Sequence, residues 1–138
     1  MNLQFIHETS VRVRYAETDQ MGYCYYGNYA TYFEIGRVEA MRALGMSYKA
    51  IEEMGKMLPV ISYKVDFLHP ALYDDVLTLK TTITKLEGAK ICFNYTIHNA
   101  NSLKICVAET TLVFVNSTSK RPTQAPKELI EILEKYAI

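Results

Sequence analysis

The sequence predicts an α+β domain in which an antiparallel sheet wraps around one long central helix. Three observations lead to this fold class. A strand-like segment with alternating apolar residues comes first, a helical segment that is apolar on most of its circumference follows, and four strand-like segments come after it. A helix that is apolar on most sides must be covered, and strands joined by short turns pair antiparallel, so we expect a curved sheet around the helix.

The first predicted strand covers residues 8–17. In this segment Val11, Val13 and Tyr15 alternate with polar or small side chains. Residues 18–27 contain turn-forming residues and two glycines, which are typical of a loop. This loop is therefore expected to connect the first strand to the long helix.

The long helix is expected to begin at Asn28, whose side chain can accept a hydrogen bond from a free backbone amide, and to end at Gly45. A second, short helix is expected between Ser47, as its cap, and Gly55. Apolar or small residues recur at helical spacing along the long helix: Tyr29, Phe33, Gly36, Ala40 and Leu44.

After the short helix the apolar period changes to two, which predicts strands. The four segments are residues 58–68, 76–87, 89–98 and 103–115. The connections contain Pro70, Gly88 and the polar residues 99–102, so they are read as short turns of a four-stranded antiparallel meander. A last helix is expected to start near Pro126.

Length and composition predict one domain over residues 1–138. Basic and acidic residues balance at 15 each, so no general attraction to nucleic acid or to an anionic membrane is expected. The cysteines Cys24, Cys92 and Cys106 form no paired motif, which favours a reducing cytoplasm. The three histidines are far apart in sequence, so no metal site and no cofactor are expected. The sequence shows neither a signal peptide nor an apolar run long enough to span a membrane.

Three segments resemble a known family. They are "RYAETDQMGYCYYGNYATYFEIGRVEAMRALG", "PALYDDVLTL" and "LVFVNSTSKRPTQAP", in this order along the chain. The chain resembles the hot-dog fold acyl-CoA thioesterases, in the branch typified by 4-hydroxybenzoyl-CoA thioesterase. The resemblance implies that Asp19 is the catalytic carboxylate and that the backbone N–H of Tyr26 is an oxyanion donor. Many members have a histidine where this chain has Tyr26. The resemblance also implies a homo-oligomer with active sites between subunits. The expected assembly is at least a dimer, and a tetramer is favoured over a dimer.

Thioester hydrolysis requires a donor to the carbonyl oxygen and a group that activates water or attacks directly. Free amides at the amino end of the long helix can supply the donor. The carboxylate of Asp19 could act as a general base or as a nucleophile, and the sequence leaves both routes open. Residues expected to bind substrate around these two groups are Tyr25, Gly27, Asn28 and Tyr29, with Gly27 leaving space for substrate beside the backbone.

Other side chains are weaker candidates. Glu34 is a second carboxylate on the helix, with Arg37 as an expected ion-pair partner. Lys90, Lys120 and Arg121 are the cations expected to bind the phosphates of coenzyme A, although such residues are usually solvated surface.

The ordinary interpretation of Asp19 is a turn residue, and spacing alone favours it. Cys24 is not expected to be a nucleophile, because no histidine lies near it in sequence. The predicted function is hydrolysis of an acyl-CoA thioester to a free acid and coenzyme A. The alternatives are a module that binds acyl-CoA or acyl-carrier protein without turnover, and a thioesterase that acts on acyl-carrier protein.

Overall fold

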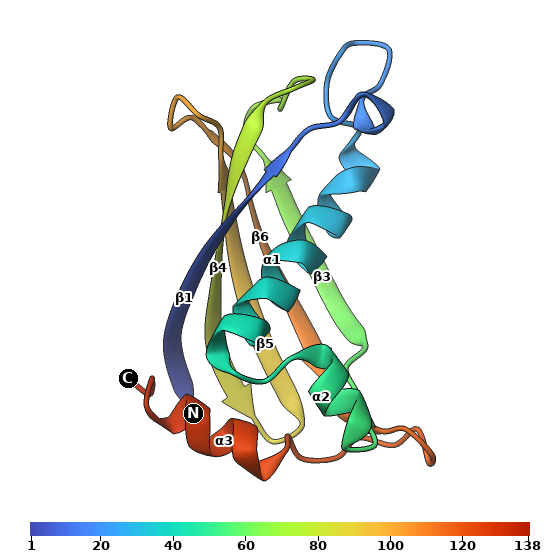
Figure 1. The fold of residues 1–138 in the computed structure, drawn as a ribbon, viewed down its shortest axis with the longest axis vertical. Coiled ribbons are helices and arrows are strands. Elements are labelled where there is room, and N and C mark those ends of the chain that lie inside the picture. The colour runs from blue at the N-terminus through green and yellow to red at the C-terminus, as the bar shows by residue number, and fades with distance from the viewer.

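The computed structural model describes residues 1–138 and contains a five-stranded antiparallel sheet that curves around one long helix (Figure 1). The strand order is β1-β4-β5-β6-β3. This arrangement confirms the predicted fold class. The strands are β1 Asn2–Arg12, β3 Val60–Phe67, β4 Val76–Glu87, β5 Lys90–His98 and β6 Lys104–Val113.

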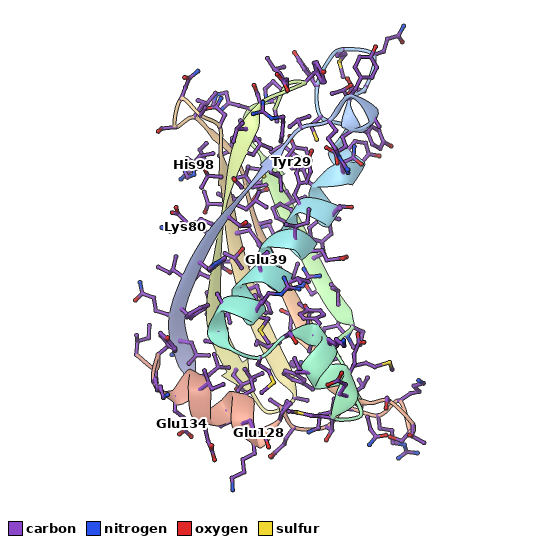
Figure 2. All side chains as sticks on the ribbon, in the orientation of Figure 1. Tyr29, Glu39, Lys80, His98, Glu128 and Glu134 are labelled. Atoms are coloured by element: carbon purple, nitrogen blue, oxygen red, sulfur yellow. The ribbon has the colours of Figure 1, made fainter.

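The long helix, α1, spans Tyr29–Leu44 and ends at Gly45, which has a left-handed φ of 100° as a glycine at this position permits. Its backbone lies close to β4, because a Cβ on Gly36 would stand 2.5 Å from Oγ1 of Thr81. Side chains of the helix and the sheet fill the space between the two layers (Figure 2). The buried residues of α1 are Tyr29, Tyr32, Phe33, Gly36, Arg37, Ala40, Met41 and Leu44.

The start of α1 differs from the prediction. The side chain of Asn28 caps no amide of the helix, so the predicted cap is wrong. Its Nδ2 donates instead to the carbonyl of Glu17 at 2.7 Å. A 3₁₀ turn, η2 Tyr26–Asn28, precedes the helix. The cap of the short helix is confirmed, because Ser47 Oγ accepts from the amide of Ala50 at 3.1 Å.

The first strand also differs. The prediction placed it at residues 8–17, whereas β1 begins at Asn2 and ends at Arg12. Pairing with β4 determines these bounds, because the register runs from Asn2 opposite Lys85 to Arg12 opposite Val76, where β4 begins. Beyond that point the chain has no partner strand and forms a 3₁₀ turn, η1 Tyr15–Glu17.

The predicted four-stranded meander is wrong for its first strand. β4, β5 and β6 are sequential neighbours, but β3 pairs with β6 at the edge of the sheet. A strand has only two edges, and those of β4 are taken by β1 and β5. The chain therefore passes from one edge region of the sheet to the other between β3 and β4.

The remaining elements close the end of the molecule opposite the start of α1. The short helix α2 Tyr48–Glu53 follows α1, and two short strands, β2 Lys56–Met57 and β7 Val115–Asn116, pair with each other. The last helix, α3 Lys127–Glu134, follows Pro126 as predicted and buries Leu129 and Leu133 in the core. None of the helices has the length and apolar character needed to cross a bilayer.

Candidate active site

The loop between η1 and η2 holds Asp19 in a tight turn. Oδ1 of Asp19 accepts the amides of Met21 at 2.9 Å and Tyr23 at 3.2 Å, and the amide of Asp19 donates to the carbonyl of Tyr23 at 2.8 Å. Gly22 has a φ of 77°, which lets the loop reverse direction. The second carboxylate oxygen makes no hydrogen bond within the chain. Asp19 is thus a turn residue through one oxygen and has the other oxygen free.

The turn η2 supplies the free amides at the amino end of α1. The amide of Asn28 already donates to the carbonyl of Tyr25 at 2.9 Å. The amides of Tyr26 and Gly27 precede the first amide donor of the turn, Asn28, and neither donates to a loop carbonyl or to a side chain. These two N–H groups carry the partial positive charge of the helix terminus and suit an oxyanion.

Asp19 and Tyr26 line one cleft of about 310 Å³. The cleft lies between the Asp19 loop, the first turn of α1 and the end of β3. Its wall is mostly apolar and aromatic, so an acyl group could be desolvated beside the carboxylate. The other lining residues are Met21, Tyr23, Cys24, Tyr29, Phe67, Leu68, His69 and Pro70.

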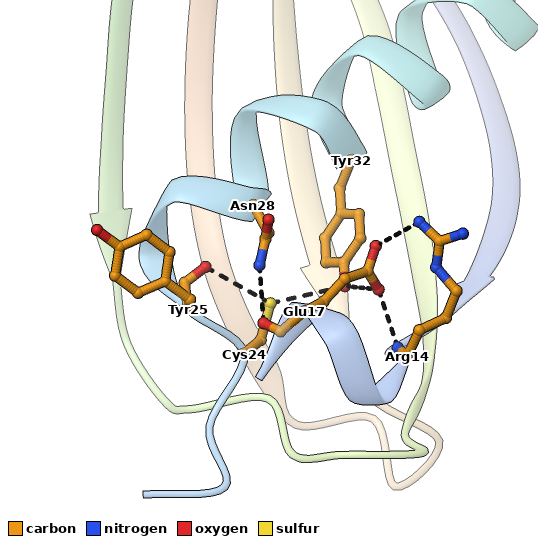
Figure 3. Close-up of polar contacts among 6 residues, drawn as sticks. All are labelled: Arg14, Glu17, Cys24, Tyr25, Asn28 and Tyr32. Atoms are coloured by element: carbon orange, nitrogen blue, oxygen red, sulfur yellow. Dashed lines mark hydrogen bonds and ion pairs between the residues drawn. The ribbon is translucent and has the colours of Figure 1, made fainter. Parts of the chain in front are cut away.

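A buried glutamate, Glu17, makes hydrogen bonds to several parts of this site (Figure 3). Its carboxylate is 8% exposed and accepts hydrogen bonds from the amide of Arg14, the guanidinium of Arg14 and the hydroxyl of Tyr32, each at 2.9 Å. Its carbonyl accepts the amide of Tyr25 at 2.8 Å and Nδ2 of Asn28 at 2.7 Å. One residue therefore connects the end of β1, the turn η2 and the core of α1.

These contacts fix the charge of the cluster. Burial acts to raise the pKa of Glu17, but the hydrogen bonds from Arg14 and Tyr32 outweigh it and lower the pKa below the ordinary value of 4.5. Burial, followed by the hydrogen bonds with Cys24 and Glu17, raises the pKa of Tyr32. At neutral pH the carboxylate is charged and the phenol remains a donor.

Cys24 is buried beside the cleft and does not form a nucleophilic pair. Its thiol donates weakly to the hydroxyl of Tyr32 at 3.6 Å, and burial raises its pKa, so the thiol stays protonated. The structure does bring His69 into the cleft, which its distance in sequence did not suggest. Nδ1 of His69 bonds to the carbonyl of Lys104 at 3.0 Å and so carries the proton, and no hydrogen bond joins His69 to Cys24.

The space beside Gly27 is not open in this subunit. A Cβ at this position would stand 2.7 Å from Cε2 of Tyr25. The space beside Gly27 is thus filled by an aromatic ring of the chain itself. The ring of Tyr25 packs against Gly27 and Tyr26, with a centroid distance of 4.7 Å to the latter, and does not line the cleft.

The predicted phosphate-binding cations do not lie near the cleft. Lys90 is the first residue of β5, and Lys120 and Arg121 follow β7. Figure 1 shows the start of β5 and the loop after β7 at the end of the molecule opposite the Asp19 loop.

Glu34 lies outside the Asp19 cleft. It is exposed on α1, and its predicted ion pair with Arg37 is absent, since none of the five ion pairs involves either residue. Both residues line a separate cavity further along the helix.

Comparison with known proteins identifies the family. A family model described as the thioesterase-like superfamily matches residues 13–133. The chain belongs to this superfamily. It is 31% identical over 120 residues to YbgC, an acyl-CoA thioester hydrolase of Escherichia coli O6:H1, and the match covers 87% of this chain and 90% of that protein.

Solved structures of thioesterases share the fold. A DHNA-CoA thioesterase from Staphylococcus aureus has a TM-score of 0.90 and 29% identity, and the match covers 94% of this chain and 89% of that one. A variant of 4-hydroxybenzoyl-CoA thioesterase, in complex with 4-hydroxybenzoyl-CoA, has a TM-score of 0.84 and 20% identity, with coverage of 94% and 99%. The family resemblance inferred from the three sequence segments is confirmed.

Two residues of this thioesterase-like site were not predicted. Glu17 was read as part of a strand, where Arg14 and Glu17 would point to opposite faces and could not pair. A helical reading of residues 14–17 places them one turn apart, and that spacing was the available signal. His69 gave no local signal, because the pairing of β3 with β6 brings it to the cleft.

Proposed function

We propose that this chain hydrolyses acyl-CoA thioesters to a free acid and coenzyme A at the Asp19 cleft. One observation carries the proposal: a carboxylate with a free oxygen and a tyrosine whose amide is a free donor at a helix start line the same apolar cleft. The similarity to acyl-CoA thioester hydrolases of the same family supports it.

The proposed reaction uses the two polar groups of the cleft. The thioester carbonyl oxygen accepts hydrogen bonds from the amides of Tyr26 and Gly27, and each such donor is worth about 10²–10³ in rate. Asp19 either removes a proton from a water that attacks the carbonyl carbon or attacks that carbon itself to form an anhydride that water then opens. In both routes the C–S bond breaks, the acid takes the oxygen of water, and a proton of that water neutralises the departing thiolate.

A second copy of the chain is proposed to pair along β3. This strand has one free edge, since it pairs only with β6. All of its residues except Val65 are exposed, although Val60, Ile61, Tyr63 and Phe67 are apolar or aromatic. An exposed edge with apolar side chains is a template for a further strand, and β3 also borders the cleft. Dimer formation here would place the cleft at the subunit interface, and a tetramer of two such dimers is compatible with it.

The free edge gives a direct test of assembly. Ile61 is about half exposed on β3, so Ile61→Lys is expected to block strand pairing while the monomer remains folded. Sedimentation velocity should then show a dimer or tetramer for the parent chain and a monomer for the variant. A monomeric parent at micromolar concentration would contradict the proposal.

Two further parts of the proposal concern the coenzyme and the compartment. Lys90, Lys120 and Arg121 are proposed to bind coenzyme A phosphates at the cleft of another subunit, since they lie far from the cleft of their own subunit. The three cysteines are free thiols, two of them buried, which supports the reducing cytoplasm as the compartment.

A panel of acyl-CoAs, with release of free thiol followed by DTNB, tests the function. We expect turnover of at least one short, long or aromatic acyl-CoA at micromolar enzyme. The same acyl groups on acyl-carrier protein are compared at equal concentration, and faster turnover on that carrier would select the carrier-protein enzyme. Tight binding of every acyl-CoA with no thiol release would select the binding module and refute hydrolysis.

A further inference from the structure

A second cavity, of about 250 Å³, lies between α1 and β3 beyond the Asp19 cleft. It is separate from that cleft and contains no residue of the Asp19 loop. Its floor holds a positively charged side chain, Arg37. The lining residues are Ala30, Phe33, Glu34, Arg37, Val60, Tyr63 and Thr110.

Arg37 is a buried cation without an anion. It is 7% exposed, and its guanidinium donates to the hydroxyl of Tyr48 at 2.9 Å and to that of Tyr95 at 3.1 Å. Both partners are neutral phenols whose pKa is raised, mainly by burial. None of the five ion pairs of the chain involves Arg37. A buried charge is costly unless an opposite charge compensates it, so the cavity favours an anion.

Aromatic pairs line both cavities along the seam between α1 and β3. Tyr29 and Phe67 line the Asp19 cleft, and their ring centroids are 5.0 Å apart. Phe33 and Tyr63 line the second cavity, at 6.0 Å. Tyr29, Phe33 and Arg37 follow one another every four residues on one face of α1. Eight residues of helix correspond to about 12 Å, which is the order of length of an extended acyl chain.

We propose that Arg37 determines specificity by binding an anionic oxygen at the far end of a long acyl group whose thioester lies at Asp19. The substrate class is then the ω-carboxyacyl-CoAs, the coenzyme A monothioesters of dicarboxylic acids. The aromatic pairs contact the chain of the acyl group, and the guanidinium replaces water around its terminal carboxylate. This inference rests on the proposed thioesterase function and adds the nature of the acyl group.

The simplest competing explanation is that Glu34 is the anion. Glu34 is exposed and lines the same cavity, three residues before Arg37 on α1. If Glu34 compensates Arg37, then Glu34→Gln lowers stability and does not change specificity. If the cavity binds a substrate carboxylate, then Glu34→Gln removes a repelling charge and increases the preference for ω-carboxyacyl groups.

The test compares matched substrates within one enzyme preparation. We measure kcat/KM for hexanedioyl-, octanedioyl-, decanedioyl- and dodecanedioyl-CoA against the methyl-ended acyl-CoA of the same length. A ratio taken within one preparation does not depend on the fraction of folded enzyme. The parent is expected to favour the carboxylate by about 10- to 100-fold at one length, as a hydrogen-bonded charge pair would give.

Arg37→Met should abolish this preference, and Arg37→Lys should keep part of it. Arg42→Met is the matched control, because Arg42 is an exposed arginine on the same helix that pairs with Glu39, and its ratio should equal that of the parent. The parent also gives a readout without turnover, since free decanedioate should bind more tightly than decanoate in isothermal titration calorimetry.

Two results overturn the inference. One is a parent ratio near one at all four lengths, and the other is an unchanged ratio in Arg37→Met. If the ratio is unchanged and Arg37→Met also dissociates an oligomer, the anion belongs to a second copy of the chain. If no acyl-CoA of either kind is hydrolysed, the proposed function fails instead, and the calorimetric comparison of decanedioate with decanoate still tests the cavity.

Discussion

Replacing Glu17 by Gln tests whether the buried carboxylate holds the site together. The substitution keeps the shape and one acceptor oxygen but removes the charge. The ion pair with Arg14 contributes at most about 1 kcal/mol, since Arg14 is largely exposed. The hydrogen bonds from the Arg14 amide and the Tyr32 hydroxyl each weaken by about 1 kcal/mol when the acceptor becomes neutral. We therefore expect a loss of about 2–3 kcal/mol in the free energy of unfolding.

The assay is thermal or urea unfolding at pH 7, where a chain of this length should lose about 3 °C in Tm per kcal/mol. Glu39→Gln is the matched control, because Glu39 also pairs with an arginine three residues away but on the exposed side of α1. That variant should lose less than about 0.5 kcal/mol. The kcat of Glu17→Gln should also fall, with KM changing less, because the carboxylate anchors Glu17 to Arg14 and Tyr32, and the carbonyl of the anchored residue holds the turn that carries the free amides.

The contribution of the Glu17 carboxylate to stability depends on pH. The pKa of Glu17 is lowered in the folded chain, so its stabilising contribution is complete above the ordinary value of 4.5. That contribution is lost as the pH falls through the lowered folded pKa. The stability difference between the parent and Glu17→Gln should therefore shrink below pH 4.5. Equal stability of the two proteins at pH 7, or a difference that persists unchanged in acid, would refute the reasoning.

Two further predictions concern the packing of α1 and the cap of α2. Gly36→Ala should lower the free energy of unfolding by about 1–3 kcal/mol, because the new Cβ would stand 2.5 Å from Thr81 Oγ1. Adding Thr81→Ala should recover part of this loss. If Gly36→Ala is as stable as the parent in urea unfolding, the close approach of helix and sheet is contradicted. Ser47→Ala should lower the free energy of unfolding by about 0.5–2 kcal/mol, because the Ala50 amide loses its hydrogen-bond acceptor. Ser47→Gly should lower it by less. Equal melting temperatures for the parent and both variants would contradict the capping role.

The parts of the fold that the sequence predicted are those set by local periodicity. The face of α1 that begins with Tyr29 and Phe33, the stop at Gly45 and the cap at Ser47 all follow from residues within one or two turns. The position of β3 at the sheet edge did not follow, because pairing with β6 is decided by which strand edges remain free. The end of β1 at Arg12 depends on β4 in the same way.

The candidate site also contains residues that the sequence predicted and residues that it did not. Asp19 and Tyr26 are seven residues apart, and the resemblance to the family predicted that they belong to one site; the structure places both in the wall of the same cleft. Glu17, His69 and Arg37 owe their positions to long-range packing and not to their neighbours in sequence. Arg37 in particular looked like a helix-surface partner of Glu34, whereas the curved sheet buries its guanidinium against two tyrosines.

The most direct measurement of the central claim is the steady-state hydrolysis rate of Asp19→Asn. Asparagine keeps Oδ1 as an acceptor for the Met21 amide, so the loop should keep its shape while the charge is lost. Asp75→Asn is the matched control, because Asp75 also accepts a backbone amide, that of Leu72, in a neighbouring loop. If Asp19 acts on the thioester carbonyl, kcat falls by about 10²–10⁴ in Asp19→Asn and stays at the parental value in Asp75→Asn. A folded Asp19→Asn enzyme with the parental kcat on the same acyl-CoA would contradict the account.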